Sequence, residues 1–202
     1  MEVKRLVCGI FQTNTYILEI DNKIIIIDPA CKMEKLLPYL EGKELLAVLL
    51  THGHFDHIKA CDDLYKQYKV PIYIHEADIE MTKNKGWGKV FGLQAVPTIS
   101  VPLVKLKETK YKIGPFNFEV IFTPGHSKGS VCYLFDYCIF TGDTLFKLAC
   151  GRCDLEGGDI SELKSSLRLL KTLNPSLIVY PGHDEITNLE YEIENNSANQ
   201  TS

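Results

Sequence analysis

The sequence contains no long hydrophobic run. Its longest apolar stretches, such as residues 24–27 and 45–50, are far shorter than the roughly 20 residues that a helix needs to cross a bilayer. The amino terminus, Met1 to Arg5, runs directly into a strand-like segment and has no apolar core of the kind found in signal peptides. We therefore expect a cytoplasmic protein that has no membrane partner.

An excess of positive charge is also absent. The chain has 22 Lys and Arg residues against 26 Asp and Glu residues, a formal net charge of -4. This balance provides no basic field for a polyanion, so we expect no nucleic-acid partner. No feature of the sequence sets the oligomeric state. The length of 202 residues and the 45% hydrophobic fraction predict a single domain over residues 1–202, with a frayed polar tail at 196–202.

The cysteines do not form an obvious disulfide framework. There are seven of them, an odd number, and they are scattered through apolar segments. We expect reduced, mostly buried thiols. Cys150 and Cys153 form a C-x-x-C pair, a pattern found in redox proteins and in halves of zinc sites. Because no second C-x-x-C completes a structural zinc site, we favour ordinary thiols over a redox or zinc role.

Strand-like and helix-like segments alternate along the chain. The Ile24–Ile27 run indicates a strand that is buried on both faces. Apolar residues at helical spacing predict helices at 33–40, 58–68, 163–173 and 189–194, with another near 76–82 and a loop over 83–96. This order is typical of an α/β sandwich with mixed β-sheets.

The stretch from Thr51 to His57 is the most informative part of the chain. It holds three of the six histidines and a carboxylate, directly after an apolar strand-like run. Side chains two residues apart on an extended segment lie on the same side, so His52 and His54 can converge on one point. Asp56 and His57 can face a second point nearby. Imidazole and carboxylate groups are the usual ligands of zinc and related divalent ions.

Three later segments repeat the same pattern of a strand, a glycine-containing turn and then His or Asp. The four segments are residues 51–57, 123–126, 141–143 and 180–183. Loops at strand ends are where α/β folds place their chemistry, and five of the six histidines fall in these turns. The sixth, His75, has no such neighbour, and we expect a structural or capping role for it.

Seven candidate metal ligands result from this pattern. They are His52, His54, Asp56, His57, His126, Asp143 and His183. Four ligands close a structural zinc site, so seven are too many for one ion. They suit two divalent ions that share a carboxylate and a hydroxide, with zinc first and iron or manganese as alternatives. The residues alone therefore indicate a binuclear metallohydrolase.

The H-x-H-x-D-H run at 52–57, together with His126, Asp143 and His183, resembles the metallo-β-lactamase superfamily. The resemblance extends from Thr13 to the region of Asn195. It implies an αββα sandwich of two mixed β-sheets flanked by helices, with the metal ions at one edge of the sheets.

The resemblance also implies roles for the ligands. His52, His54 and His126 would hold one metal ion, and Asp56, His57 and His183 the other. Asp143 would bridge the two ions. Asp56 and Asp143 are the candidate catalytic residues, because the bridging hydroxide would attack the substrate carbonyl and Asp56 would help to orient it.

Residues 142–146 and 150–152 are similar to the short relatives of glyoxalase II, the hydroxyacylglutathione hydrolase. This likeness implies a small-molecule thioester as substrate. Arg152 falls where glyoxalase II carries a lysine that contacts glutathione, so it is a candidate substrate contact. A C-terminal glutathione-binding helical domain, as in glyoxalase II itself, is not expected within residues 1–202.

One alternative reaction remains open. A persulfide dioxygenase shares this fold and ligand set but uses a single iron ion, and residues 150–152 resemble that group as well. Flavodiiron proteins typically have Glu at the position of His54, and a common class of β-lactamases has Cys at that of Asp143. Nucleases of the superfamily usually carry a basic surface, which this sequence does not have.

Overall fold

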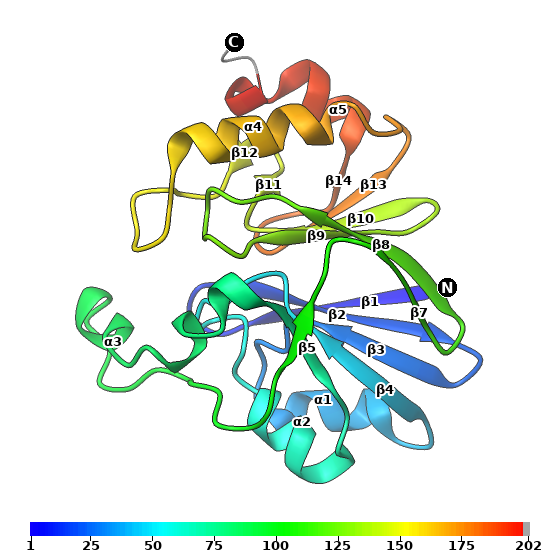
Figure 1. Cartoon of the computed structure of the whole chain (residues 1–202). Helices are drawn as coiled ribbons and strands as arrows, with labels where there is room; N and C mark the ends of the chain where they lie inside the picture. The colour runs from blue at the N-terminus through cyan, green and yellow to red at the C-terminus, as the bar shows by residue number, and fades with distance from the viewer. Residues whose placement is uncertain (200–202) are drawn as a thin grey trace.

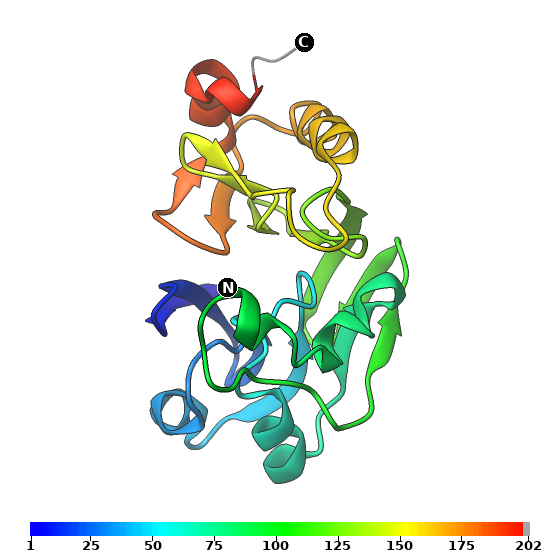
Figure 2. The ribbon, with the colours of Figure 1, turned by 90° about the vertical axis from the view of Figure 1, so that its left-hand side faces the viewer.

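The computed structural model describes residues 1–199 and consists of two six-stranded mixed β-sheets packed face to face, with helices on the outer faces (Figure 1). Figure 2 shows the two sheets as separate layers, the amino-terminal sheet below and the carboxy-terminal sheet above. This is the αββα sandwich that the family resemblance implied.

The amino-terminal sheet, sheet A, has the strand order β1-β2-β3-β4-β5-β6. Its first three strands are antiparallel, whereas β3 to β6 run parallel. The strands are β1 (Glu2–Cys8), β2 (Thr13–Ile20), β3 (Lys23–Ile27), β4 (Glu44–Leu49), β5 (Ile72–His75) and β6 (Val104–Leu106).

The carboxy-terminal sheet, sheet B, has the order β14-β13-β10-β9-β8-β7. Among its neighbouring strands only β10 and β13 run parallel, and the other pairs are antiparallel. The strands are β7 (Lys110–Ile113), β8 (Phe116–Phe122), β9 (Val131–Leu134), β10 (Cys138–Gly142), β13 (Ile178–Pro181) and β14 (Thr187–Asn188). A separate two-stranded sheet joins β11 (Leu145–Phe146) and β12 (Ala149–Cys150).

The helices cover the outer faces of the two sheets. On sheet A lie α1 (Met33–Leu40) and α2 (Cys61–Tyr68), and on sheet B lie α4 (Ile160–Leu170) and α5 (Leu189–Asn195). The short helix α3 (Trp87–Val90) projects at one edge, and the 3₁₀ turns are η1 (Glu76–Asp78), η2 (Met81–Lys83) and η3 (Ser197–Asn199).

Strand β3 explains why both faces of sheet A are covered. Ile24 and Ile26 point into the apolar layer under α1 and α2, whereas Ile25 and Ile27 point into the layer between the two sheets. All four side chains are buried. Alternate side chains of a strand face opposite sides of the sheet, so an unbroken apolar run requires cover on both sides.

Three local predictions need correction. The helix expected at 58–68 begins only at Cys61. The helix expected near 76–82 is two separate 3₁₀ turns, because Asp78 turns inward and is fully buried. The loop expected over 83–96 contains the helix α3.

Two further expectations are also wrong in part. Cys8 and Cys31 form a disulfide, with their Cα atoms 5.0 Å apart, so the seven cysteines are not all reduced. The expected frayed tail at 196–202 starts too early. Asn196 is buried, and its Nδ2 donates hydrogen bonds to the carbonyl oxygens of Phe146 and Ala149. Residues 200–202 lie outside the described residues.

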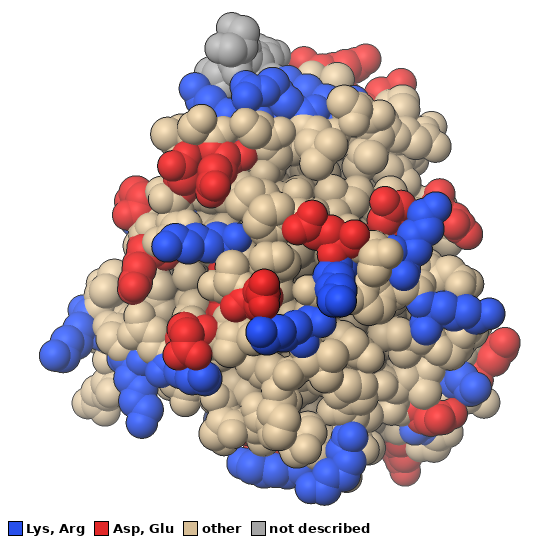
Figure 3. Space-filling model, viewed as in Figure 1, with Lys and Arg blue, Asp and Glu red and all other residues tan. Residues whose placement is uncertain are grey.

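The surface carries both signs of charge. On the face in Figure 3, acidic and basic side chains are mostly interspersed, and basic ones gather over α4, which contains Lys164 and Arg168. Within residues 1–199, no helix has the length and apolar character needed to cross a membrane.

Candidate metal centre

The seven predicted ligands meet at one edge of the sandwich, where loops from both sheets face each other. His52, His54, Asp56 and His57 all lie in the loop after β4 of sheet A. The other three follow three strands of sheet B: His126 follows β8, Asp143 follows β10 and His183 follows β13. The strands hold these loops in place, while the loops contribute the polar groups.

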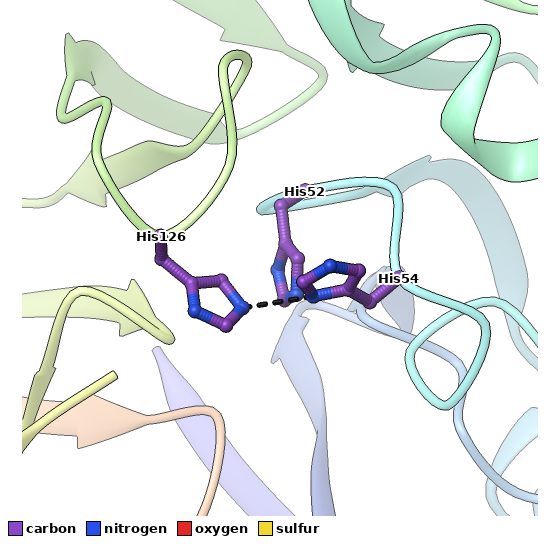
Figure 4. Close-up of side chains that lie close together, drawn as sticks. All are labelled: His52, His54 and His126. Carbon is purple, nitrogen blue, oxygen red and sulfur yellow. Dashed lines mark hydrogen bonds between the residues drawn. The ribbon is translucent and has the colours of Figure 1, made fainter. Parts of the chain in front are cut away.

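His52, His54 and His126 form the first cluster, in which the candidate ligand atoms lie within 4.8 Å of one another. His52 and His54 extend from one loop towards His126 on the opposite loop (Figure 4). His54 Nδ1 lies 2.8 Å from His126 Nε2. All three side chains are buried. Three imidazoles converging from two sheets form a site that could hold one divalent ion.

Asp56, His57 and His183 form the second cluster, again within 4.8 Å. Asp143 lies between the two clusters. Its Oδ1 is 3.4 Å from His57 Nε2, and its Oδ2 is 3.4 Å from His126 Nε2 and 3.3 Å from His183 Nε2. One carboxylate therefore faces residues of both clusters, as a bridging ligand must.

Gly182 creates the space that this arrangement needs. A Cβ atom at position 182 would lie 2.2 Å from Asp143 Oδ1 and 2.9 Å from the His57 ring. Any other residue would therefore displace Asp143 or His57.

Hydrogen bonds on the outer side of the rings determine where the imidazole lone pairs point. His126 Nδ1 lies 2.7 Å from the carbonyl oxygen of Arg152, and His183 Nδ1 lies 2.9 Å from that of Phe11. A carbonyl oxygen only accepts hydrogen bonds, so both Nδ1 atoms must carry the proton. In each neutral ring, Nε2 then has the free lone pair and faces the cluster, which is the tautomer a metal ligand requires.

Asp28 has the same effect on two more rings. His57 Nδ1 donates to Asp28 Oδ2 over 2.9 Å. The hydroxyl of Thr51 also donates to Asp28 Oδ2, at 2.6 Å, and so is free to accept from His52 Nδ1 at 3.0 Å. His52 and His57 therefore also present Nε2 to the site.

Several buried polar atoms of the site have no hydrogen-bond partner within the described part of the chain. They include Nε2 of His52, His54 and His57, and Oδ1 of Asp143. A buried polar atom without a partner destabilises a fold by about 1–3 kcal/mol. His57 Nε2 and Asp143 Oδ1 face each other across 3.4 Å, and His54 turns its other ring nitrogen, Nδ1, towards His126. Polar atoms gathered in this way fit a centre that coordinates cations.

Burial and neighbouring charges shift the pKa values of these groups in opposite directions. Burial lowers the pKa of His54 to about 3 and that of His52 well below its usual value. Burial also disfavours the charged form of His57, but the carboxylates of Asp56, Asp143 and Asp28 outweigh it and raise the pKa to about 9. His52 and His54 are therefore neutral and ready to coordinate, while the acidic residues attract positive charge to the second cluster.

The residues that support the ligands were not predicted from the sequence. Asp28 and Thr51 orient two histidines, and Thr13 donates a hydrogen bond to Asp56 Oδ2 at 2.8 Å. Asp28 follows a buried strand, as the ligand loops do, so the same pattern could have indicated it. His75 accepts a hydrogen bond from the backbone N–H of Ala77, which confirms the predicted capping role.

A cavity of about 380 Å³ opens onto the two clusters. Four phenylalanines contribute to its wall: Phe11, Phe55, Phe91 and Phe146. Arg152 also lines it, but the guanidinium makes two hydrogen bonds of 2.7 Å to Asp154. Cys150 and Cys153 are free thiols that pack beside the apolar layer under α4.

Known proteins resemble this chain in sequence and in fold. The metallo-beta-lactamase superfamily model matches residues 8–183. A Bacillus subtilis protein named probable metallo-hydrolase YqgX is 35% identical, over 97% of this chain and 96% of its own. Another B. subtilis protein, named probable polyketide biosynthesis zinc-dependent hydrolase PksB, is 34% identical over 83% of this chain and 71% of its own.

Solved structures agree with these relatives. The BLEG-1 B3 metallo-beta-lactamase superposes with a TM-score of 0.91 and 35% identity, covering 100% of both chains. TTHA1623, solved in a di-iron-bound form, superposes with a TM-score of 0.88 and 36% identity, over 96% of this chain and 99% of its own. The family model spans most of the chain, and the fold agrees with these solved structures. The protein belongs to the metallo-beta-lactamase superfamily.

Proposed function

We propose that this protein is a binuclear metal-dependent hydrolase that cleaves a small thioester of the hydroxyacylglutathione type. The observation that carries the proposal is the pair of three-residue clusters, each drawn from both sheets, with the Asp143 carboxylate between them. Membership of the superfamily supports it, as do relatives named as metallo-hydrolases.

Each cluster would hold one divalent ion. His52, His54 and His126 are the proposed ligands of the first ion. Asp56, His57 and His183 are those of the second, and Asp143 joins both. Imidazole and carboxylate ligands favour zinc, in line with the zinc-dependent hydrolase named among the relatives. The di-iron form of a similar structure supports a pair of ions and makes iron the main alternative, ahead of manganese.

Bound there, two divalent ions would supply Lewis acidity and a water molecule that is nucleophilic near neutral pH. The protein's part is to position groups around that water. Asp56 lines the cavity, and Thr13 fixes it by donating to Oδ2. We assign to Asp56 the orientation of the attacking water, and to Asp143 the fixed spacing of the two clusters.

Arg152 is the proposed contact for the polar part of the substrate. It lines the cavity beside the clusters, and its partner Asp154 is exposed, so the ion pair can open towards a ligand. The likeness of residues 150–152 to the short glyoxalase II relatives supports a thioester with an anionic group on one side.

The test combines metal content with turnover in the wild type and in Asp143→Ala. We expect about two zinc ions per wild-type chain and hydrolysis of S-D-lactoylglutathione or a similar small thioester. The variant should lose one ion or more and at least about 1,000-fold in kcat/KM, because the clusters lose their shared carboxylate. Asp136→Ala, in an exposed turn, is the matched control.

Two results would overturn the proposal. One is full activity of protein stripped of metal, and the other is unchanged activity of Asp143→Ala. Oxygen consumption by iron-loaded protein in the presence of glutathione persulfide, without thioester hydrolysis, would instead assign the persulfide dioxygenase reaction.

A further inference from the structure

A second, apolar groove lies next to the metal-site cavity. It has a volume of about 240 Å³ and lies between the turn that joins β1 to β2 and the segment that follows α3. Ile10 and Phe11 line it from the turn, and Leu93, Ala95 and Pro97 from the segment. Two lining residues carry an ionisable side chain: Asp56, which belongs to the second cluster, and Lys59. Cys8 also lines the groove but is part of the disulfide. The lining therefore suits an apolar ligand.

The groove adjoins the metal-site cavity. Phe11, Phe55 and Asp56 line both spaces. The rings of Phe11 and Phe55 meet edge to face, with their centroids 5.5 Å apart, and both also contact Phe91. An acyl chain whose carbonyl lies at the clusters would have to pass along these rings to reach the groove.

Ile10 leaves apolar surface at the groove open to water. Ile10 is 74% exposed, the highest value among the large hydrophobic residues that the structure describes as exposed. An apolar cavity of about 150 Å³ holds one benzene molecule, which has six carbon atoms. By the same proportion, a groove of about 240 Å³ takes about eight to ten carbon atoms.

We propose that this groove binds the acyl chain of the substrate, so that the preferred thioester carries an apolar acyl group of about eight to ten carbon atoms. The proposal rests on the thioester hydrolysis proposed above and assigns it a longer, apolar acyl group in place of the short hydroxyacyl group. A short hydroxylated group such as lactoyl reaches the clusters but leaves the groove to water. A longer alkyl chain removes Ile10, Leu93 and the ring edges from water, which favours binding in proportion to the area covered.

Chain length is the first test. The zinc-loaded protein is assayed with S-acyl-N-acetylcysteamine thioesters from acetyl to dodecanoyl, which share one thiol and differ only in the acyl chain. We expect kcat/KM to rise about threefold per methylene group and to level off at eight to ten carbons. Rates that do not depend on acyl length, or that fall with it, overturn the proposal.

Variants at two neighbouring positions test whether the dependence of kcat/KM on acyl length arises in the groove. Ala95 lines the groove, and Gln94 beside it is exposed and does not. Ala95→Phe fills part of the groove and should lower the octanoyl-to-acetyl ratio of kcat/KM about tenfold. Gln94→Phe adds the same ring outside the groove and should leave that ratio unchanged. A ratio that stays constant in Ala95→Phe, or that falls equally in both variants, contradicts the assignment.

A measurement of octanoate binding distinguishes failure of this proposal from failure of the proposed function. Titration calorimetry with octanoate does not depend on turnover. Octanoate binding that Ala95→Phe weakens about tenfold, and Gln94→Phe does not, supports the groove even if no thioester is hydrolysed. Thioester hydrolysis without octanoate binding, and without dependence on acyl length, leaves the hydrolase proposal intact and overturns this one.

Discussion

At the scale of single residues, Asp28 supports the metal centre without belonging to either proposed ligand set. Its two oxygens accept from the backbone N–H of Thr51, the hydroxyl of Thr51 and the ring of His57. The residue is buried and adopts a left-handed backbone with φ 49°. Its charge and its position both serve to orient the rings.

We expect Asp28→Asn to weaken zinc binding about 10- to 100-fold, the usual effect of losing a partner of a metal-ligating histidine. Asparagine tolerates the left-handed backbone. Its side chain has only one acceptor oxygen, whereas the donors of Thr51 and His57 now share the two carboxylate oxygens of Asp28. Competition with a chromophoric chelator measures the affinity. Asp21→Asn is a matched control, since Asp21 also has φ 49° but lies in an exposed turn. Equal affinities in the two variants would contradict this role for Asp28.

The convergence of the seven candidate ligands could be predicted, because strands that end at one sheet edge bring their following turns together. The periodic apolar runs located the strands, and the dense His and Asp residues marked the turns. The pairing of Cys8 with Cys31 could not be read in this way. It depends on the packing of β1 against the loop after β3, a tertiary contact that no local pattern records.

At the scale of elements, the 3₁₀ turn η1 connects two ligand loops through hydrogen bonds. Asp78 is buried there and accepts hydrogen bonds from the N–H groups of Gly53 and Gly129, at 2.9 and 2.7 Å. It also accepts from the hydroxyl of Ser127, at 2.6 Å. A Cβ atom at position 53 would lie 2.7 Å from the Asp78 carbonyl oxygen, so Gly53 allows this close approach. The loops that carry His54 and His126 are thus joined through one carboxylate.

Asp78→Asn should reduce the free energy of unfolding by about 2–3 kcal/mol. The NH₂ group of asparagine replaces one carboxylate oxygen, so the N–H of Gly53 or Gly129 loses its acceptor. Zinc affinity should fall as well, since the two loops separate more easily. Urea denaturation of the metal-free variant measures the first effect and chelator competition the second. Asp136→Asn, in the exposed turn between β9 and β10, is the control. A loss of stability below about 0.5 kcal/mol would show that η1 does not join the loops through Asp78.

The segment from η1 to α3 was the hardest part to predict. Its turns are short, and their conformation depends on contacts with distant parts of the chain rather than on a repeating apolar pattern. Trp87 packs edge to face on His54, with 5.1 Å between the ring centroids, and Phe91 contacts Phe11 and Phe55. These contacts join segments that are far apart in the sequence, so no local pattern predicts them.

At the scale of the whole molecule, the proposed metal ions lie where the two sheets meet. Each cluster takes two residues from the loop after β4 of sheet A and one from a loop of sheet B. An ion in either cluster therefore links the two layers, in addition to the apolar contacts between them. Without ions, the two opposed loops would meet at this edge with buried polar atoms of histidine and aspartate left unpaired.

Metal removal should therefore destabilise the whole fold and not only the loops. Zinc at about 1,000 times its dissociation constant adds about 4 kcal/mol to the free energy of unfolding, which corresponds to about 10 °C in Tm for a chain of this size. Scanning calorimetry of zinc-loaded and chelator-treated protein measures the difference. Asp143→Ala, which lacks the shared carboxylate, should show a clearly smaller shift. If chelation abolishes activity but leaves Tm unchanged, the ions do not link the sheets, and the ligands must be held in place by the protein alone.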